Sequence, residues 1–556
     1  MAYDLLIKNG TIVDGTGAPP RHGDIAIEGG TIAEVGTVDG SARQTIDASD
    51  LIVAPGFIDP HTHYDAQICW DPMLTCSSWH GVTSVIMGNC GVGLAPCVPQ
   101  ARDIATWDLV NVEAIPFDVL SKGINWEWKT FPEYMDAAAR RGSGINLGFL
   151  APLTPFRHFV MGEESMERAA TPEETTEIKA LVKEAVAAGA FGFTTTAILQ
   201  HIGYQGRPLA CRLASRDEFK AYANALKELD KGAIELALTK ITGILAEDEC
   251  DFIDMLLTES RRPVTWLSLR KRTDRPGAYE ETLRRSEPLV KRGAIPQISN
   301  LPTRNQLDMR DPFIFSVHPC FKPAFNQTAE AQRKLYSDPE FRNAFRKSLE
   351  VPKGAFTGKW DSVTVQFVSN PAMKPLEGKS VYEIARERGK DPIDTLFDLA
   401  LKDNLELLYA MALFEPIPEL LGDARTLLGV SDGGAHVAQI CDAGYCTDLL
   451  GNWVRDKQIM PLEHAIKRIT TEPARFFGIK DRGRLTAGLA ADITIFDFNT
   501  VNSGSRPEWR YDLPGGGRRL VVTAEGIEYT IVNGRVLYEH QHHTGALPGK
   551  VLRSAV

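Results

Sequence analysis

The 556-residue sequence lacks three features that mark large classes of proteins. No run of about 18 apolar residues is present, so we expect no membrane span. Basic residues are not in excess, because 61 Lys and Arg stand against 72 Asp and Glu; a nucleic-acid partner is therefore not expected. Residues 1–10 lack the basic and apolar regions of a signal peptide. These absences favour a cytoplasmic protein with a small-molecule partner.

Disulfides, nucleotide-binding loops and histidines are also scarce. The nine cysteines are odd in number and scattered, which argues against a disulfide framework and fits a reducing compartment. No Gly-x-Gly-x-x-Gly fingerprint or Walker loop is present. Only twelve histidines occur, and none lies between His201 and His318. With 43% hydrophobic and 24% charged residues, the chain has the composition of a globular protein with a large core.

Both chain ends consist of short strands separated by turn signals. Asn9-Gly10 near the start and Asn533-Gly534 near the end are two-residue hairpin signals between apolar runs. A short sheet leaves a face and edges that need cover, and pairing the two ends would supply it. We therefore predict one small β-sandwich built from residues 1–53 and 483–556.

The middle of the chain, residues 54–482, alternates short apolar strands with helical segments. One such segment, Thr171 to Gly189, opens with a Thr-Pro cap signal and stops at glycine. About eight strand–helix units predict an α/β fold of the (β/α)₈ barrel type, with a doubly wound open sheet as the alternative. A long insertion around 301–363, rich in Phe, Pro and Arg, is expected to cover the mouth of the barrel.

The clearest chemical motif is His61-Thr62-His63, which ends the segment Ala54–His63 after the apolar strand Leu51–Val53. In an extended chain alternate side chains point to the same side, and the two Cα atoms are about 7 Å apart. Both imidazoles can therefore reach one metal ion. A lone His pair is usually structural, but its position at a strand end favours metal binding.

Two further candidate groups also follow apolar strands. Cys90 lies in Gly88-Asn89-Cys90-Gly91, where it is either a zinc ligand or a buried free thiol in a glycine-lined turn. Asp432 precedes two glycines, and such a carboxylate can touch a metal and accept a proton from water. His436, four residues later, is a candidate neighbour of the reacting groups.

These blocks resemble the amidohydrolase superfamily, and within it the N-acyl-D-amino-acid deacylase (D-aminoacylase-like) branch. The resemblance covers nearly the whole chain. It implies a distorted TIM barrel, a zinc site and hydrolysis of an amide or related C–N bond other than a peptide bond. By this resemblance His61, His63 and Cys90 bind the metal and Asp432 is the base near it. The blocks that carry it are Val53–His63, Gly81–Gly91, Arg157–Gly162, Ser431-Asp432 and Gly488–Asp492.

The sequence departs from that family at the fifth and sixth barrel strands. The family supplies histidine ligands there, whereas Ala233–Leu238 and Val264–Leu269 contain none. We therefore expect one zinc ion, held by His61, His63, Cys90 and Asp432, with either Cys90 or Asp432 as a weak or outer ligand because a catalytic zinc needs an open position. His201 is the nearest replacement ligand, although an ordinary loop histidine remains the alternative.

The departure also leaves the substrate open. A family member that releases amino acids needs a cation for the substrate carboxylate, since a buried unpaired carboxylate is costly. Arg157 and Arg207 are candidates, with Tyr64 as a wall of the pocket; other cations of the barrel region are Arg212, Arg270, Arg304, Lys240 and Lys271.

Three hypotheses about function follow. The leading one is a metal-dependent amidohydrolase that acts on an N-acyl amino acid or similar small amide, with Asp432 as general base and His436 near the oxyanion. The second is a cyclic amide, lactone or other C–N hydrolase of the same superfamily. The third is a non-catalytic barrel relative that acts as a binding protein. A homo-oligomer is expected on general grounds.

Overall fold

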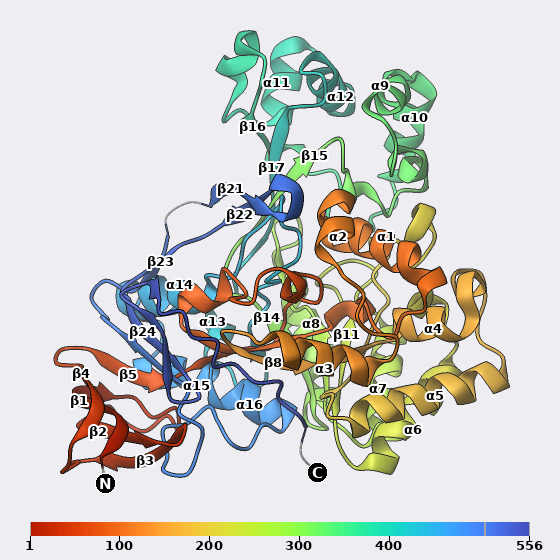
Figure 1. Ribbon diagram of the computed structural model, residues 1–556. Helices are drawn as coiled ribbons and strands as arrows, with labels where there is room; N and C mark the ends of the chain where they lie inside the picture. The colour runs from red at the N-terminus through yellow and green to blue at the C-terminus, as the bar shows by residue number, and fades with distance from the viewer. Residues whose placement is uncertain (1, 505–506, 555–556) are drawn as a thin grey trace.

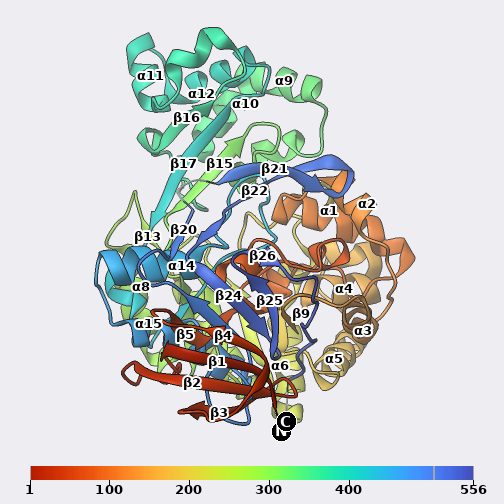
Figure 2. The ribbon, with the colours of Figure 1, turned by 60° about the vertical axis from the view of Figure 1, so that its left-hand side comes forward.

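Three parts of the chain are distinguishable in the computed structural model, which describes residues 2–504 and 507–554 (Figure 1). Strands from the two chain ends, red and blue, lie side by side in both views (Figures 1 and 2). The barrel lies beside them, and a layer of green and cyan helices and strands stands above it. The α/β class and the joined chain ends agree with the prediction.

The chain ends share a nine-stranded sheet with the order β26-β25-β24-β19-β5-β1-β2-β3, in which β4 pairs with β1. Its two halves meet where β5 pairs antiparallel with β19, with Val53 opposite Ile495. Both of these side chains are fully buried. The strands are β1 (Tyr3–Ile12), β2 (Arg21–Glu28), β3 (Thr31–Gly36), β4 (Ala42–Asp47), β5 (Ile52–Pro55), β19 (Ile493–Phe496), β24 (Ile527–Val532), β25 (Arg535–Glu539) and β26 (His542–His543).

The barrel strands are all parallel but fall into two sheets, β6-β7-β8 and β9-β10-β11-β12-β14-β18. The sheets are joined by a hydrogen bond from Phe191 N to Phe149 O (2.7 Å) and by a bridge between Thr62 and Gly433. This interruption makes the barrel distorted. The strands are β6 (Phe57–Asp59), β7 (Val82–Met87), β8 (Asn146–Phe149), β9 (Ala151–Pro152), β10 (Gly192–Thr196), β11 (Ala233–Ala237), β12 (Val264–Leu267), β14 (Ala294–Ile298) and β18 (Leu427–Leu428).

Helices between the strands cover the outside of the barrel (Figure 1). The predicted helix after Thr171 is α5, and the Thr171 hydroxyl accepts from the backbone N–H of Glu174 in a capping box. No helix among the described residues is long and apolar enough to cross a membrane. The main outer helices are α3 (Phe131–Arg141), α5 (Pro172–Ala187), α6 (Arg216–Leu229), α7 (Glu247–Ser260) and α8 (Ala278–Val290).

The inserted layer has its own sheet and its own aromatic core. Strand β17 pairs with β15, β16 and β13, and the last of these follows barrel strand β12. The sequence predicts an insertion around 301–363, whereas in the structure the layer continues to the end of β17 at Glu415. Residues after 363 do not stand out as an insertion in the sequence, because they alternate strand and helix as a barrel unit does. The elements are β13 (Lys271–Arg272), β15 (Thr303–Asp308), α9 (Ala329–Ser337), α10 (Pro339–Ser348), β16 (Val363–Phe367), α11 (Val381–Arg388), α12 (Pro392–Lys402) and β17 (Leu408–Glu415).

A hairpin near the C-terminus leaves the sandwich and reaches the mouth of the barrel. It consists of β21 (Glu508–Leu513) and β22 (Gly517–Val521). Leu520 N donates to Val437 O at 2.7 Å, which ties the hairpin to the loop after β18. The figures show the hairpin between the barrel and the inserted layer (Figures 1 and 2). The hairpin thus belongs to the segment 483–556 but forms a two-stranded sheet apart from the nine-stranded one.

Asp492 joins the sandwich to the barrel through one buried carboxylate. It accepts from the Asn146 side chain of β8 at 2.9 Å and from Asn533 N at 2.7 Å, and it pairs with Arg482. The side chains of both charged partners are at most 4% exposed. Removing one partner of such a pair leaves the other charge buried and uncompensated.

We predict that Asp492→Asn lowers the free energy of unfolding by about 3 kcal/mol, measured by denaturant unfolding. Asp481 supplies the matched control, because it pairs with the same Arg482 at 3.0 Å but is 64% exposed. Asp481→Asn should cost less than about 1 kcal/mol. Equal losses in the two variants would contradict this role of burial.

Candidate metal centre at the mouth of the barrel

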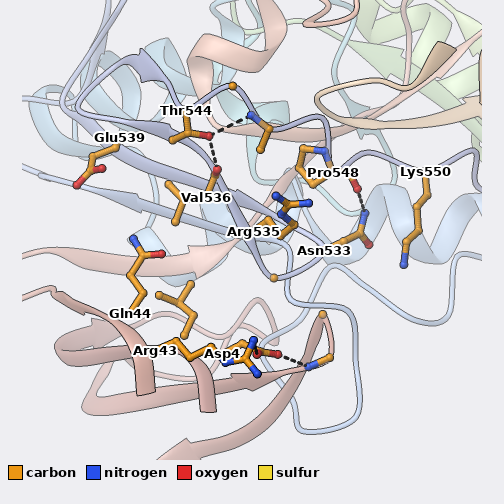
Figure 3. A pocket seen from close by; sticks show the side chains of 16 residues that line it. Asp4, Arg43, Gln44, Asn533, Arg535, Val536, Glu539, Thr544, Pro548 and Lys550 are labelled. Atoms are coloured by element: carbon orange, nitrogen blue, oxygen red, sulfur yellow. Dashed lines mark hydrogen bonds and ion pairs between the residues drawn. The ribbon is translucent and has the colours of Figure 1, made fainter. Parts of the chain in front are cut away.

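Two hollows of the molecule differ in chemistry. The larger, about 990 Å³, lies in the sandwich, and Figure 3 shows its charged side chains Arg43, Arg535, Glu539 and Lys550. None of its described lining residues is His or Cys. The smaller cavity, about 130 Å³, lies at the barrel mouth and is lined by three histidines, a cysteine and two carboxylates: His63, His201, His436, Cys90, Glu113 and Asp432. The smaller cavity is therefore the candidate site.

The end of β6 brings both motif histidines to the barrel mouth, where His63 lines this cavity. Thr62 between them faces the other way, and its N and Oγ1 both donate to Ile86 O of β7, at 3.0 and 2.8 Å. His63 N donates to Gly433 O at 2.7 Å. The chain is thus bonded to the neighbouring strand end on each side, and the alternation expected from the sequence holds.

Four donor atoms converge at this point. His61 Nε2 lies 3.3 Å from His63 Nε2, 3.6 Å from Cys90 Sγ and 3.3 Å from Asp432 Oδ1. His63 Nε2 is 3.8 Å from the same Asp432 oxygen. The His61, His63 and Cys90 donors all lie within 4.8 Å of one another, and these three residues are buried.

This donor set fits a metal ion. Ligands about 2.1 Å from a tetrahedral ion lie about 3.4 Å from one another, which matches the spacings of the His61 and Cys90 donors. Two imidazoles and a thiol are ligands that zinc prefers. The fourth group, Asp432, has a side chain that is 21% exposed, whereas those of His61 and His63 are at most 3% exposed. Asp432 is thus the ligand candidate that faces the open side.

A buried hydrogen-bond relay holds the first and last barrel strands together beneath the donors. Ser431 Oγ donates to Asp59 Oδ2 at 2.5 Å and lies 3.2 Å from His61 O. Asp59 Oδ1 also accepts from His61 N at 3.3 Å. All three residues are at most 1% exposed. The relay fixes the backbone of His61 relative to Asp432, although 371 residues separate them in the sequence.

Two carboxylates that no sequence motif indicated lie behind the imidazoles. Glu113 Oε1 is 3.2 Å from His63 Nδ1, and Glu235 Oε1 is 4.0 Å from His61 Nδ1. Glu235 Oε2 also accepts from Cys90 N at 2.8 Å. Glu235 could have been suspected as the one charge in the apolar strand β11. Glu113 ends helix α1 (Arg102–Glu113), where nothing in the local sequence distinguishes it.

Burial governs the protonation of the cluster. It lowers the pKa of His61 to about 3 and that of His63 well below its ordinary value. Burial, followed by the nearby Glu235 carboxylate, raises the pKa of the Cys90 thiol well above its ordinary value. Burial raises the pKa of Asp432 to about 6, and Arg270 opposes that rise. Neutral imidazoles are ready to bind a metal, and a bound cation would favour the thiolate of Cys90.

The two other predicted histidines line the cavity but stand outside the convergent donors. His201 Nδ1 is 2.9 Å from Thr196 Oγ1, and burial lowers its pKa to about 3. His436 follows Asp432 on the same loop, and burial lowers its pKa to about 4. Neither belongs to the three-residue group that can hold an ion among the described residues.

The structure places the three residues predicted to bind substrate in other contacts. Arg157 is buried in an ion pair with Glu218, which joins helices α4 (Leu153–Met161) and α6. Arg207 pairs with Glu163 and Glu167 at the surface. Tyr64 donates to or accepts from Ser77 Oγ at 2.7 Å in the core. None of the three lines the barrel-mouth cavity.

Arg270 is the cation that reaches the cavity. Its Nε donates to Ser268 Oγ at 2.9 Å, and its Nη1 lies 3.3 Å from Thr303 Oγ1. No ion pair with a carboxylate joins it within the described part of the chain; burial lowers its pKa, and the charges of Asp432 and Asp442 oppose that shift. The apolar side chains that line the cavity with it come mostly from the inserted layer: Ile198, Leu267, Phe313, Ile314, Leu413 and Phe414.

A parallel barrel with imidazole, thiol and carboxylate groups at its strand ends is the arrangement of a metal-dependent hydrolase. The family model described as "Amidohydrolase family" matches residues 44–538. The chain therefore belongs to the amidohydrolase family of C–N hydrolases, in its D-aminoacylase-like branch. The D-aminoacylase of Alcaligenes xylosoxydans xylosoxydans is 28% identical over 99% of this chain and 97% of its own. The N-acyl-D-glutamate deacylase of that organism is 25% identical over 99% and 96%.

Solved structures show the same fold. A D-aminoacylase crystal structure superposes with a TM-score of 0.69 at 24% identity, covering 99% of this chain and all of the other. The N-acyl-D-glutamate deacylase of Bordetella bronchiseptica, solved with zinc and a phosphonate inhibitor, gives the same TM-score and identity over the full length of both chains. These likenesses establish the barrel and sandwich architecture.

We predict that His61→Ala and His63→Ala each abolish stoichiometric zinc binding, because each removes a donor that no nearby group replaces. Elemental analysis after dialysis against zinc-buffered solution measures this. His201→Ala is the matched variant, and it should keep the wild-type zinc content. Loss of zinc in His201→Ala would show that the loop histidine is a ligand after all.

Proposed function

We propose that this protein hydrolyses the amide bond of a small N-acyl amino acid, using one zinc ion at the barrel mouth. The observation that carries the proposal is the meeting of His61, His63, Cys90 and Asp432 beside a cavity with one unpaired cation. The names of the similar D-aminoacylase and N-acyl-D-glutamate deacylase indicate substrates of this kind for those two enzymes. One solved relative carries zinc, which supports that metal here.

One ion suffices for this proposal. The strands that would supply further histidines, β11 and β12, bring Glu235 and Leu267 toward the site in this chain. For the binuclear centre of a solved D-aminoacylase, one metal ion is described as activating the enzyme and a second as attenuating it. A mononuclear site is therefore compatible with activity in a relative.

The chain's own groups can perform the proton transfers. A bound zinc ion would polarise the scissile carbonyl and lower the pKa of a water molecule. The Asp432 carboxylate, at the open side of the cluster, accepts the water proton and returns it to the leaving nitrogen. His436, a neutral imidazole on the same loop, donates a hydrogen bond to the developing oxyanion.

Arg270 is proposed to bind the free carboxylate of the substrate. A guanidinium with unused donors in a largely apolar wall forms a strong charge-assisted pair with a carboxylate. The cavity volume of about 130 Å³ corresponds to roughly ten water-sized positions. This size suits a short acyl group on one amino acid.

We predict that Asp432→Asn lowers kcat on N-acetyl amino acids by about 10³-fold or more, because the amide cannot accept the proton. Steady-state kinetics measures the loss, and circular dichroism checks the fold. Asp442→Asn is the control: Asp442 follows on the same loop but does not line the barrel-mouth cavity. A fully active Asp432→Asn variant would remove Asp432 from the role of base.

We predict that Arg270→Gln raises KM for N-acetyl amino acids roughly 10- to 100-fold, with a smaller change in kcat. The effect should vanish on N-acyl amines, which lack the carboxylate. Arg304→Gln is the matched control, since Arg304 is 59% exposed and pairs with Glu415. A wild-type enzyme that hydrolyses cyclic amides but no N-acyl amino acid would refute the substrate class while leaving the metal site intact.

A further inference from the structure

Glu113 makes two contacts that join separate parts of the site. Its side-chain Oε1 is 3.2 Å from His63 Nδ1, and its main-chain O accepts from His436 N at 2.5 Å. One residue therefore touches a candidate ligand and the loop that carries Asp432. Glu113 occupies the last position of helix α1, and the next residue, Ala114, turns the chain away with φ of 49°.

The carboxylate of Glu113 is buried beside His63. Its side chain is 2% exposed, and Oε1, 3.2 Å from His63 Nδ1, has no hydrogen-bond partner among the described residues. Burying a carboxylate without a partner is costly, so its position calls for a specific interaction. His63 Nδ1 also lacks a hydrogen-bond partner in the described part of the chain, so the two unpartnered atoms that face each other are the natural pair.

The contact sets the orientation of the imidazole. With the proton on Nδ1 and directed at Glu113, the lone pair of His63 Nε2 faces His61 Nε2, 3.3 Å away. A metal ligand of this kind gains basicity and a fixed ring orientation from a carboxylate behind it. Glu235 is less suited to the same task, because it lies 4.0 Å from His61 Nδ1 and already accepts from Cys90 N.

We propose that Glu113 is a positioning residue, which fixes the tautomer and ring orientation of His63 and thereby strengthens metal binding. This inference rests on the metal site of the proposed function. Glu113 acts through His63 and does not itself touch the ion or the substrate. Because its carbonyl also holds His436, a side-chain substitution isolates the effect on His63 from the anchoring of the loop.

Helix α1 offers a matched control. Asp108, on the same helix, is also a buried carboxylate and bonds to a buried imidazole, His158 Nε2, at 2.9 Å. It does not line the barrel-mouth cavity. Asp108→Asn therefore reproduces the loss of a buried carboxylate–histidine contact without touching the metal site.

The test measures zinc affinity of the full-length protein by competition with a chelator of known affinity at fixed pH. We expect Glu113→Gln to weaken zinc binding by about 10- to 100-fold. We expect Asp108→Asn to keep the wild-type affinity and Glu113→Asp to recover part of it. The absorption spectrum of cobalt-loaded protein should also change in Glu113→Gln, because the ligand field depends on the His63 ring.

The outcomes separate this inference from the function on which it rests. Wild-type zinc affinity in Glu113→Gln, or an equal loss in Asp108→Asn, overturns the positioning role. A fall from two bound ions to one in Glu113→Gln also overturns it, since Glu113 would then be a ligand. Wild-type protein that binds no zinc overturns the proposed function as well, whereas the absence of activity on N-acyl amino acids leaves the affinity comparison valid.

Discussion

The site depends on one constraint: the strands are parallel, so groups that follow distant strands meet at one edge. His61 follows β6, Cys90 follows β7 and Asp432 follows β18. The first and last barrel strands belong to different sheets and are joined after their ends by the Thr62–Gly433 bridge, and the Asp59–Ser431 relay adds a side-chain link between them. The precision of the donor cluster thus rests on a buried hydroxyl–carboxylate contact beneath it.

Sequence reasoning succeeded where local pattern and tertiary structure agree. The paired chain ends, the barrel and helix α5 followed from hairpin signals, strand–helix alternation and a cap motif. The convergence of His61, His63, Cys90 and Asp432 was predictable because each directly follows an apolar strand. Residues that follow parallel barrel strands all lie at the same end of the barrel, so their position along the chain nearly determines their position in space.

The groups that sequence reasoning missed are held by contacts between distant segments. Glu113 ends an ordinary helix, and only its packing against His63 reveals it. Arg157 and Arg207 were expected at the substrate, but each forms an ion pair with a glutamate outside the cavity. Arg270 follows β12, has no ion pair within the described residues, and lies 5.9 Å from the ring of Phe414 in the inserted layer. Which arginine stays unpaired is decided by the whole fold, and no local motif encodes it.

The inserted layer supplies much of the apolar wall but none of the four convergent donors. Strand β17 ends at Phe414 and Glu415 beside β13, directly after the barrel strand that leads to Arg270. Substitutions in this layer can therefore reshape what enters the cavity without disturbing the cation site. The architecture therefore separates the selection of substrates from the hydrolytic chemistry, and substrate range can change while the reaction stays the same.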